Sequence, residues 1–183
     1  MATDPPKISF ARLVEEDLEL LHRWLNEPHV RKWWDADGCT REQVEEKYRP
    51  RLAGQVPVFC FFVLWNDLPV GYIQCYWLAD FPDYKSRLGI ETLVEPAACL
   101  DVFIGDAASL AKGIGTKAIG SFLLQVVFGE LAAGSCLVGP DLHNEIAINA
   151  YRKSGFVYLK TVEGFGGDSS EYLMLALSSD FLA

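Results

Sequence analysis

The sequence lacks a hydrophobic run long enough to cross a membrane, and it is poor in basic residues. Its longest apolar stretch, VPVFCFFVLW, is too short to span a bilayer. No positively charged start followed by an apolar stretch opens the chain, so we expect a cytoplasmic protein that does not bind membranes. Acidic residues outnumber basic ones by 25 to 16, and the net charge of -9 disfavours nucleic acid as a partner. The same charge would attract a cationic substrate, although it also serves simple solubility.

Motifs for metal binding and for serine-hydrolase chemistry are also missing from the sequence. The three histidines have no metal-ligand spacing with one another or with the cysteines, and no GxSxG motif occurs. We therefore expect no metal cofactor. The number of cysteines, 5, is odd, and three of them lie inside apolar runs, where they are expected to be buried thiols. This usage indicates a reducing compartment.

Length and composition favour one domain covering residues 1–183. Half of the residues are hydrophobic, which suffices for one well-filled core, and the chain contains no internal repeat, linker or low-complexity tract. Periodicity and turn residues predict two helices after a first strand, and Thr40 with Gln43 forms a capping box for the second. We expect a helix-to-helix connection over 29–38 and a long functional or disordered loop over 79–97. The predicted strands are 7–13, 58–65, 70–78, 98–105, 135–140, 156–162 and 171–177. The predicted helices are 15–28, 41–53, one containing 119–127 and one between Asn144 and Gly155.

This order of elements predicts a mixed α/β sheet. A strand, a crossover helix and a strand in the middle of the chain imply a parallel pair, because such a crossover returns the chain in the same direction. The two predicted hairpins imply antiparallel neighbours in the same sheet.

The stretch LAKGIGTKAIGSFLLQVVF, residues 110–128, places a glycine pair and two lysines before an amphipathic run. It fails the Walker phosphate-loop pattern because Thr116 separates Gly115 from Lys117, and it lacks a third glycine at the spacing of a dinucleotide site. Glycines at 113 and 115 still allow the backbone to approach an anion at the positive end of a helix. A plain tight turn between strand and helix is the alternative.

The order of motifs around this stretch resembles the GCN5-related N-acetyltransferase (GNAT) superfamily. DVFIG, KGIGTK and NEIAINAYRKSGF are similar to its acetyl-CoA-binding core. With LHRWLNEPHVRKWW, PVGYIQCYW and GGDSSEYLM, the likeness extends over nearly the whole chain to the aminoglycoside 6'-N-acetyltransferases. The resemblance implies a GNAT fold, an α/β architecture whose mixed, mostly antiparallel, twisted sheet has a central splayed parallel strand pair and flanking helices.

The resemblance also implies acetyl-CoA as co-substrate. In this superfamily the pyrophosphate binds the backbone amides of the glycine turn, and the pantetheine lies between the splayed strands. Leu110 stands where the family usually has Gln or Arg, so one side-chain contact is missing. The residues assigned to acetyl-CoA on this basis are Phe103, Ile104, Lys112, Gly113, Ile114, Gly115, Thr116, Lys117 and Asn144.

Two residues are candidates for the acid–base chemistry of acetyl transfer. Asp101 lies within a predicted strand, where aspartate is disfavoured, and a buried ion pair would be one reason for it. Its match to the family's catalytic aspartate instead implies a carboxylate that binds the substrate ammonium and accepts its proton. Tyr151 lies in the AYRKSGF motif, whose tyrosine in this superfamily protonates the leaving thiolate, whereas the sequence pattern alone favours a core aromatic.

Further residues are implied as contacts of a cationic sugar. The WWDADG segment places aromatic faces beside carboxylates, which suits cation–π contacts and ion pairs, although core packing is the commoner role of such aromatics. Asp168 matches an acidic position that binds substrate in the family, or is a solvated turn residue. The family's other acidic residue aligns with Gly139, so Asp141 either replaces it from two positions away or has no such role. The implied substrate contacts are Trp34, Asp35, Tyr48, Asp101, Asp141 and Asp168.

The resemblance therefore implies an antibiotic-resistance enzyme that acetylates the 6'-amine of an aminoglycoside by direct attack within a ternary complex. No cysteine lies in a motif that would make it an acyl carrier. Two alternatives stay open: a GNAT enzyme acting on another amine, such as a siderophore precursor or a protein N-terminus, and a module that binds CoA or a cationic drug without chemistry. The sequence is compatible with a monomer or a homodimer.

Overall fold

A computed structural model describes residues 7–163 and 169–182, and the chain divides into two compact units. The first unit comprises Met1–Gln74 and Val102–Ser121, and the second comprises Cys75–Asp101 and Phe122–Ala183. The single domain expected over the whole chain stays a prediction. Among the described residues, no helix is both long and apolar enough to cross a membrane.

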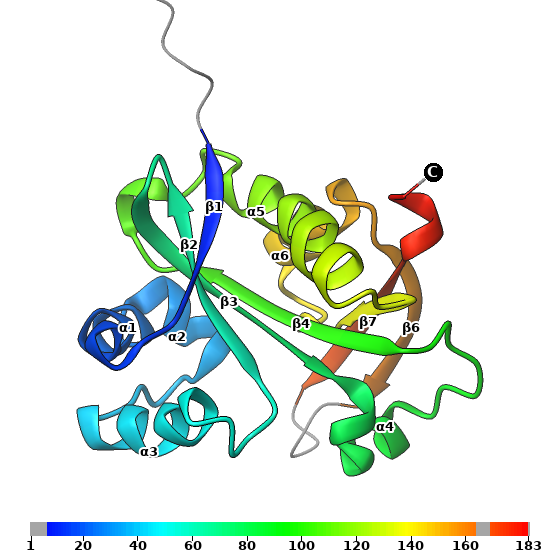
Figure 1. Cartoon of the computed structure of the whole chain (residues 1–183), viewed down its shortest axis with the longest axis horizontal. Coiled ribbons are helices and arrows are strands. Elements are labelled where there is room, and N and C mark those ends of the chain that lie inside the picture. Colours follow the sequence, from blue (N-terminus) through cyan, green and yellow to red (C-terminus); the bar gives the residue numbers. More distant parts are fainter. Residues whose placement is uncertain (1–6, 164–168, 183) are drawn as a thin grey trace, which may run out of the picture. The chain divides into compact units, whose positions relative to one another are not determined.

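Seven strands form one mixed sheet (Figure 1). They are β1 (Ile8–Arg12), β2 (Phe59–Trp65), β3 (Leu68–Trp77), β4 (Ala97–Ile104), β5 (Ser135–Val138), β6 (Val157–Glu163) and β7 (Ser170–Leu177). Their order in the sheet is β1-β2-β3-β4-β5-β7-β6. β4 and β5 run parallel, whereas β1 with β2, β5 with β7 and β6 with β7 are antiparallel. The predicted mixed sheet with a parallel pair is confirmed.

The parallel pairing of β4 and β5 is short. It covers Ala97–Cys99 against Ser135–Leu137, although β4 continues to Ile104. Asp101 therefore lies two residues beyond the last residue of β4 that pairs with β5.

The helices occur between the strands. They are α1 (Leu18–Leu25), α2 (Pro28–Trp34), α3 (Arg41–Leu52), α4 (Pro82–Leu88), α5 (Ile114–Phe122), which continues as a π-helix over Leu123–Glu130, and α6 (Glu145–Lys153). Short 3-10 turns cover Glu15–Asp17, Leu78–Asp80, Ala107–Ser109 and Ser178–Asp180.

In the first unit, α1 packs against α2 and α3 (Figure 1). α1 buries the predicted apolar face of Leu18, Leu21 and Leu25. The predicted capping box begins α3: the Gln43 amide donates to Thr40 Oγ1 at 3.3 Å, and the Thr40 amide donates to Gln43 Oε1 at 2.7 Å. Each of these caps satisfies an amide that the helix itself leaves without a partner.

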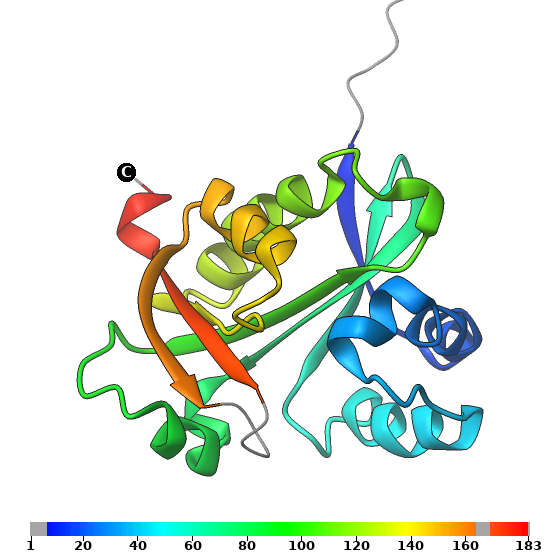
Figure 2. The ribbon, with the colours of Figure 1, turned by 180° about the vertical axis from the view of Figure 1, so that it is seen from behind.

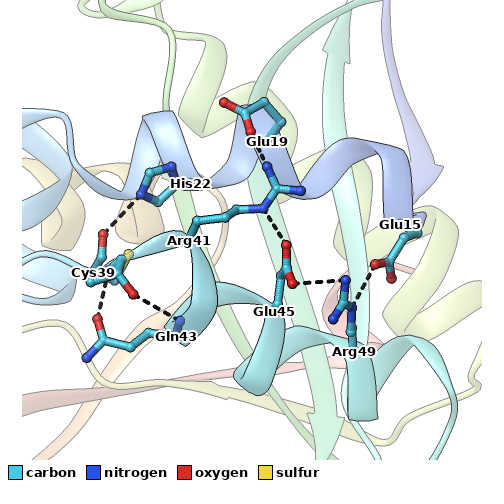
Figure 3. A network of polar contacts seen from close by, with 9 residues as sticks. Glu15, Glu19, His22, Cys39, Arg41, Gln43, Glu45 and Arg49 are labelled. Atoms are coloured by element: carbon cyan, nitrogen blue, oxygen red, sulfur yellow. Dashed lines mark hydrogen bonds and ion pairs between the residues drawn. The ribbon is translucent and has the colours of Figure 1, made fainter.

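Charged side chains join α1 and the turn before it to α3 (Figure 3). Arg41 pairs with Glu19 and with Glu45, and Arg49 bridges Glu45 and Glu15. Most of these side chains are partly exposed, so each pair contributes only about 0–1 kcal/mol. Their common effect is to fix how α3 is aligned along α1.

The chain between α2 and α3 is held by His22 of α1, which Figure 3 shows beside Cys39, and by Asn26, which follows α1. Asn26 Nδ2 donates to the Cys39 carbonyl at 2.9 Å, and the Cys39 amide donates to Asn26 Oδ1 at 3.2 Å. His22 Nε2 lies 3.1 Å from the same carbonyl. The segment that carries Asp35 is therefore anchored at its far end.

Two segments that the sequence predicts as connection and loop contain helices. The expected connection over 29–38 is helical as far as Trp34, and the expected loop over 79–97 contains α4, so both predictions are wrong in part. Pro28 and Pro82 stand at the first position of these helices, where the missing amide hydrogen costs nothing. In the second case Gly89, with φ of 54°, ends the helix in the left-handed conformation.

The second unit confirms the other predicted elements. Asn144 Oδ1 accepts the Ala147 amide at 3.1 Å and caps α6, and Gly155, with φ of 97°, follows its end. The antiparallel β6–β7 hairpin, orange and red in Figure 2, closes the chain. The predicted apolar face of the central helix, of which Ile119 belongs to the first unit, is buried at every position: Ile119, Phe122, Leu123, Val126 and Val127. Its π-helical continuation was not predicted.

Candidate active site

The glycine turn of the first unit has the geometry that an anion needs. The Lys117 amide donates to the Gly113 carbonyl at 3.1 Å as α5 begins, so the amides of Ile114 and Gly115 belong to the first helical turn, whose amides point along the helix axis. Gly113 has φ of 72°, and a Cβ there would meet no described atom within 4 Å. Exposed Lys112 and Lys117 add positive charge beside this open backbone.

Neighbouring residues of β4 lie close to the turn. A Cβ at Gly115 would stand 3.8 Å from Ile104 Cγ1, so two of the residues assigned to acetyl-CoA are adjacent. Gly71 of β3 faces the same strand, because a Cβ there would lie 2.5 Å from the Phe103 carbonyl oxygen. The sequence analysis missed Gly71, whose small size lets the two strands approach.

Three of the predicted substrate contacts line one cavity of the first unit. Its volume is about 150 Å³, and its walls are Leu25, Trp34, Asp35, Cys39, Gln43, Val44, Lys47 and Tyr48. The sequence prediction that grouped Trp34, Asp35 and Tyr48 thus agrees with their positions, whereas Trp33 is exposed and holds Lys32 Nζ 4.5 Å from its ring centre.

Tyr48 is the most buried of the predicted substrate residues. Its side chain has no exposed surface, and among the described residues its hydroxyl has no hydrogen-bond partner. Burial raises the pKa of this hydroxyl well above its usual range, so it stays protonated. Arg51 lies 5.0 Å from the ring centre.

Asp101 and Tyr151 are electrostatic neighbours in the second unit. Tyr151 lies on α6 and is 6% exposed, and Asp101 is half-buried on β4. Burial, and then the negative charge of Asp101, raise the pKa of the Tyr151 hydroxyl well above its usual range. A phenol in this setting stays protonated at neutral pH and can act only as a donor or an acid.

Asp101 also acts on two other buried groups. Burial, and then Asp101, raise the pKa of the Tyr76 hydroxyl and of the Cys99 thiol. The negative charge of Asp101 therefore acts on neutral phenols and thiols around it. Such a carboxylate can accept a proton from an ammonium group that reaches it.

The remaining predicted residues of this unit have separate roles. Asn144 caps α6, as predicted. Asp141 Oδ1 accepts the His143 amide at 2.8 Å, and its backbone bridges to Glu171. Asp168 lies outside the described residues. In the described ranges 7–163 and 169–182, no group of three or more His, Cys, Asp or Glu could hold a metal ion.

Glu171 of β7 was not predicted. Its carboxylate is held by Arg87 at 2.7 Å and by the Tyr84 hydroxyl at 3.3 Å. A pattern in the sequence could have indicated it. Glu171 is two residues from the fully buried Leu173, and residues two apart in a strand lie on the same face, so an acidic group is placed on the inner face of the strand.

Comparisons with known proteins agree with this fold. The chain matches the model of the acetyltransferase (GNAT) domain over residues 13–164. It is similar to the aminoglycoside N(6')-acetyltransferases type 1 of Klebsiella pneumoniae and Serratia marcescens, each 29% identical over 165 residues, which are 85% of this chain and 76% of the relative. Its structure is similar to that of AAC(6')-Ib with paromomycin and acetyl-CoA, with a TM-score of 0.84, 27% identity and 96% of both chains covered. It is also similar to AAC(6')-Ib with coenzyme A and kanamycin, with a TM-score of 0.83, 27% identity and coverage of 96% of this chain and 98% of the other.

Proposed function

Because the chain belongs to the GNAT acetyltransferase family, we propose that it transfers the acetyl group of acetyl-CoA to the 6'-amine of an aminoglycoside. The observation that carries the proposal is the placement of Asp101, which lies just beyond the short parallel ladder of β4 and β5. Its negative charge, after burial, raises the pKa of the Tyr151 hydroxyl and keeps that hydroxyl protonated. The names of the two curated relatives and the ligands of the two AAC(6')-Ib structures support the substrate class. The net charge of -9 favours a polycationic substrate as well.

The glycine turn would hold acetyl-CoA. The amides at the start of α5, with Lys112 and Lys117, suit a pyrophosphate, because the helix start and the lysines both attract negative charge. Phe103 and Ile104 would offer the β4 backbone to the pantetheine. Bound acetyl-CoA supplies the reactive thioester, and the remaining residues assigned to it are Gly113, Ile114, Gly115, Thr116 and Asn144.

The chain's own residues would then manage two protons. Asp101 takes the proton of the substrate ammonium, directly or through a water molecule, and the free amine attacks the thioester carbonyl carbon. The carbon–sulfur bond breaks with the electron pair leaving on sulfur, and Tyr151 gives its proton to that thiolate. The attacking nitrogen then still carries one proton more than an amide, and this proton passes, directly or through water, to the Tyr151 phenolate and restores it. Attack is direct, since burial raises the pKa of the thiols of Cys60, Cys99 and Cys136 and makes them poor acyl carriers.

The cationic sugar rings would contact carboxylates and aromatic faces. Trp34 and Tyr48 would offer ring faces to ammonium groups, and Asp35 would pair with one of them. Asp141 and Asp168 remain proposed contacts on the second unit. Each of these assignments can be tested by the effect of a single substitution on the KM for the aminoglycoside.

One assay tests the function itself. Thiol release from acetyl-CoA is measured with kanamycin-type substrates that have or lack a 6'-amine. Release only with the 6'-amine supports the proposal, and acetylation that ignores that amine contradicts the regiochemistry. Activity confined to other amines would identify a GNAT enzyme with a different substrate, and binding without release of free thiol would identify a binding module.

A further inference from the structure

Glu171 carries a carboxylate that the site described above does not yet use. Two side chains of α4 fix it: Arg87 donates to Oε1 at 2.7 Å and the Tyr84 hydroxyl donates to Oε2 at 3.3 Å. The side chain is 16% exposed, so the carboxylate is neither sealed in the core nor free in solvent. A carboxylate held by two side chains is pre-organised for a ligand, because little ordering remains to be done on binding.

The Glu171 carboxylate lies directly over Gly139, at the end of β5. A Cβ at Gly139 would stand 2.5 Å from Glu171 Oε2, so any side chain there would force the end of the Glu171 side chain to move. The absence of a side chain at Gly139 therefore makes room for an acidic group that comes from the neighbouring strand. Asp141, two residues further on, bonds its Oδ1 to the His143 amide in its own turn. Of the two acidic residues, Glu171 is the one aimed at the end of β5.

Glu171 and Asp101 act on the same side chains. After burial, which is the largest cause, both carboxylates raise the pKa of Tyr76, of Tyr84 and of Cys99. Both charges therefore act on the same three neutral groups. Arg87 balances one of the two negative charges, so these groups together keep a net negative charge that attracts an ammonium group.

We propose that Glu171 is a specificity-determining residue that binds a second ammonium group of the polycationic substrate beside Asp101, with Arg87 as its positioning residue. The inference rests on the proposed function for the identity of the substrate. It makes the second unit a two-carboxylate site, in which Asp101 serves the reacting amine and Glu171 serves another amine of the same molecule.

The test is kanamycin binding by Glu171→Gln, measured by calorimetry and compared with the wild type. Loss of one charge-assisted hydrogen bond should weaken the Kd about tenfold, and the KM for kanamycin should rise in parallel. The KM for acetyl-CoA should stay within about twofold and kcat within about threefold, because this carboxylate does not touch the reacting atoms. Asp180→Asn is the matched control, since it removes an exposed carboxylate of the same unit and should change neither constant.

A second variant separates substrate binding from a merely structural role. Glu171→Ala should weaken kanamycin binding, and adding Gly139→Asp should restore the Kd to within about threefold, because the truncation opens the space that the new carboxylate needs. Thermal melting of each variant shows whether the fold is intact. A structural role alone would change the melting temperature and leave the Kd ratio between kanamycin and its deamino analogues unchanged.

The outcomes separate the inference from the function on which it rests. Equal kanamycin affinity in the wild type and in Glu171→Gln overturns the inference and leaves the function standing. Absence of kanamycin binding by the wild type overturns both. If Glu171→Gln weakens the binding of kanamycin but not that of one deamino analogue, the result supports the inference and identifies the amine that Glu171 binds.

Discussion

Asp101→Asn keeps the shape of the side chain and removes the negative charge that acts on Tyr151, Tyr76 and Cys99. If Asp101 takes the proton of the substrate amine, the variant has no base at that position. General-base catalysis typically contributes about 10²- to 10⁴-fold to a rate. At about 1.36 kcal/mol per tenfold, this corresponds to roughly 3–5 kcal/mol of activation free energy. We expect kcat to fall by that factor.

The assay is thiol release at saturating acetyl-CoA and aminoglycoside, with acetyl-CoA affinity measured separately by calorimetry. The affinity for acetyl-CoA should stay within about threefold of the wild type, because Asp101 is not among the residues assigned to CoA binding. Asp83→Asn, which changes an exposed carboxylate of α4, should leave kcat unchanged. The competing explanation is a structural ion pair. It predicts a lower melting temperature, at a cost of about 3–5 kcal/mol, with normal turnover by the folded fraction. A kcat within threefold of the wild type would remove Asp101 from the mechanism.

Three further predictions test the acid, the glycine turn and the buried phenols. Tyr151→Phe should lower kcat about a hundredfold with unchanged KM values, and an unchanged kcat in the thiol assay would make Tyr151 a plain core aromatic. Gly113→Ala, at φ of 72°, should lower the free energy of unfolding in urea by about 1–2 kcal/mol and raise the KM for acetyl-CoA. If both values stay normal, the turn does not need glycine to bind acetyl-CoA through its backbone amides. Tyr76 and Tyr151 have folded-state pKa values raised above the ordinary value of 10.0, so their stabilising contribution is complete below pH 10 and is lost as pH rises beyond it. Urea midpoints should therefore fall above pH 10, and less steeply in Tyr76→Phe.

The sequence predicts best where local chemistry decides the structure. The capping box of Thr40 with Gln43 and the Asn144 cap each depend on residues three apart or fewer, and both are present. The parallel pair of β4 and β5 follows from the strand–helix–strand order, because a crossover helix leaves no other short route. These features need no knowledge of distant contacts.

The sequence predicts less well where a short helix depends on tertiary packing. α2 and α4 are each seven residues long, and an isolated helix of that length is not stable in water. α4 persists because Leu88 is fully buried in a cluster with Leu78, Cys99 and Leu173. A window along the chain does not contain those partners, so a loop was the reasonable local expectation for 79–97.

The candidate site also contains residues that the sequence predicts and one that it misses. Trp34, Asp35 and Tyr48 were grouped from resemblance and from side-chain chemistry, and they share one cavity. Asp101 and Tyr151 were proposed from their motifs, and their electrostatic coupling agrees with the pairing without testing it. Glu171 was missed because its partners Arg87 and Tyr84 are more than 80 residues away in sequence, as the separations of 84 and 87 show.

Glu171 and Gly139 illustrate that the charge at one place in the structure can come from a residue distant in sequence. A carboxylate near the end of β5 can be attached to β5 itself or can reach over from β7, since neighbouring strands lie only about 5 Å apart. Gly139, at the end of β5, therefore does not leave this region without a charge. Its small size leaves room for the Glu171 carboxylate, which reaches over from β7. A Gly139→Asp substitution in the presence of Glu171 would force the end of the Glu171 side chain to move and would place a second carboxylate beside it, which adds like-charge repulsion. The two residues should therefore be exchanged together, and Gly139→Asp alone should lower stability while the double change with Glu171→Ala does not.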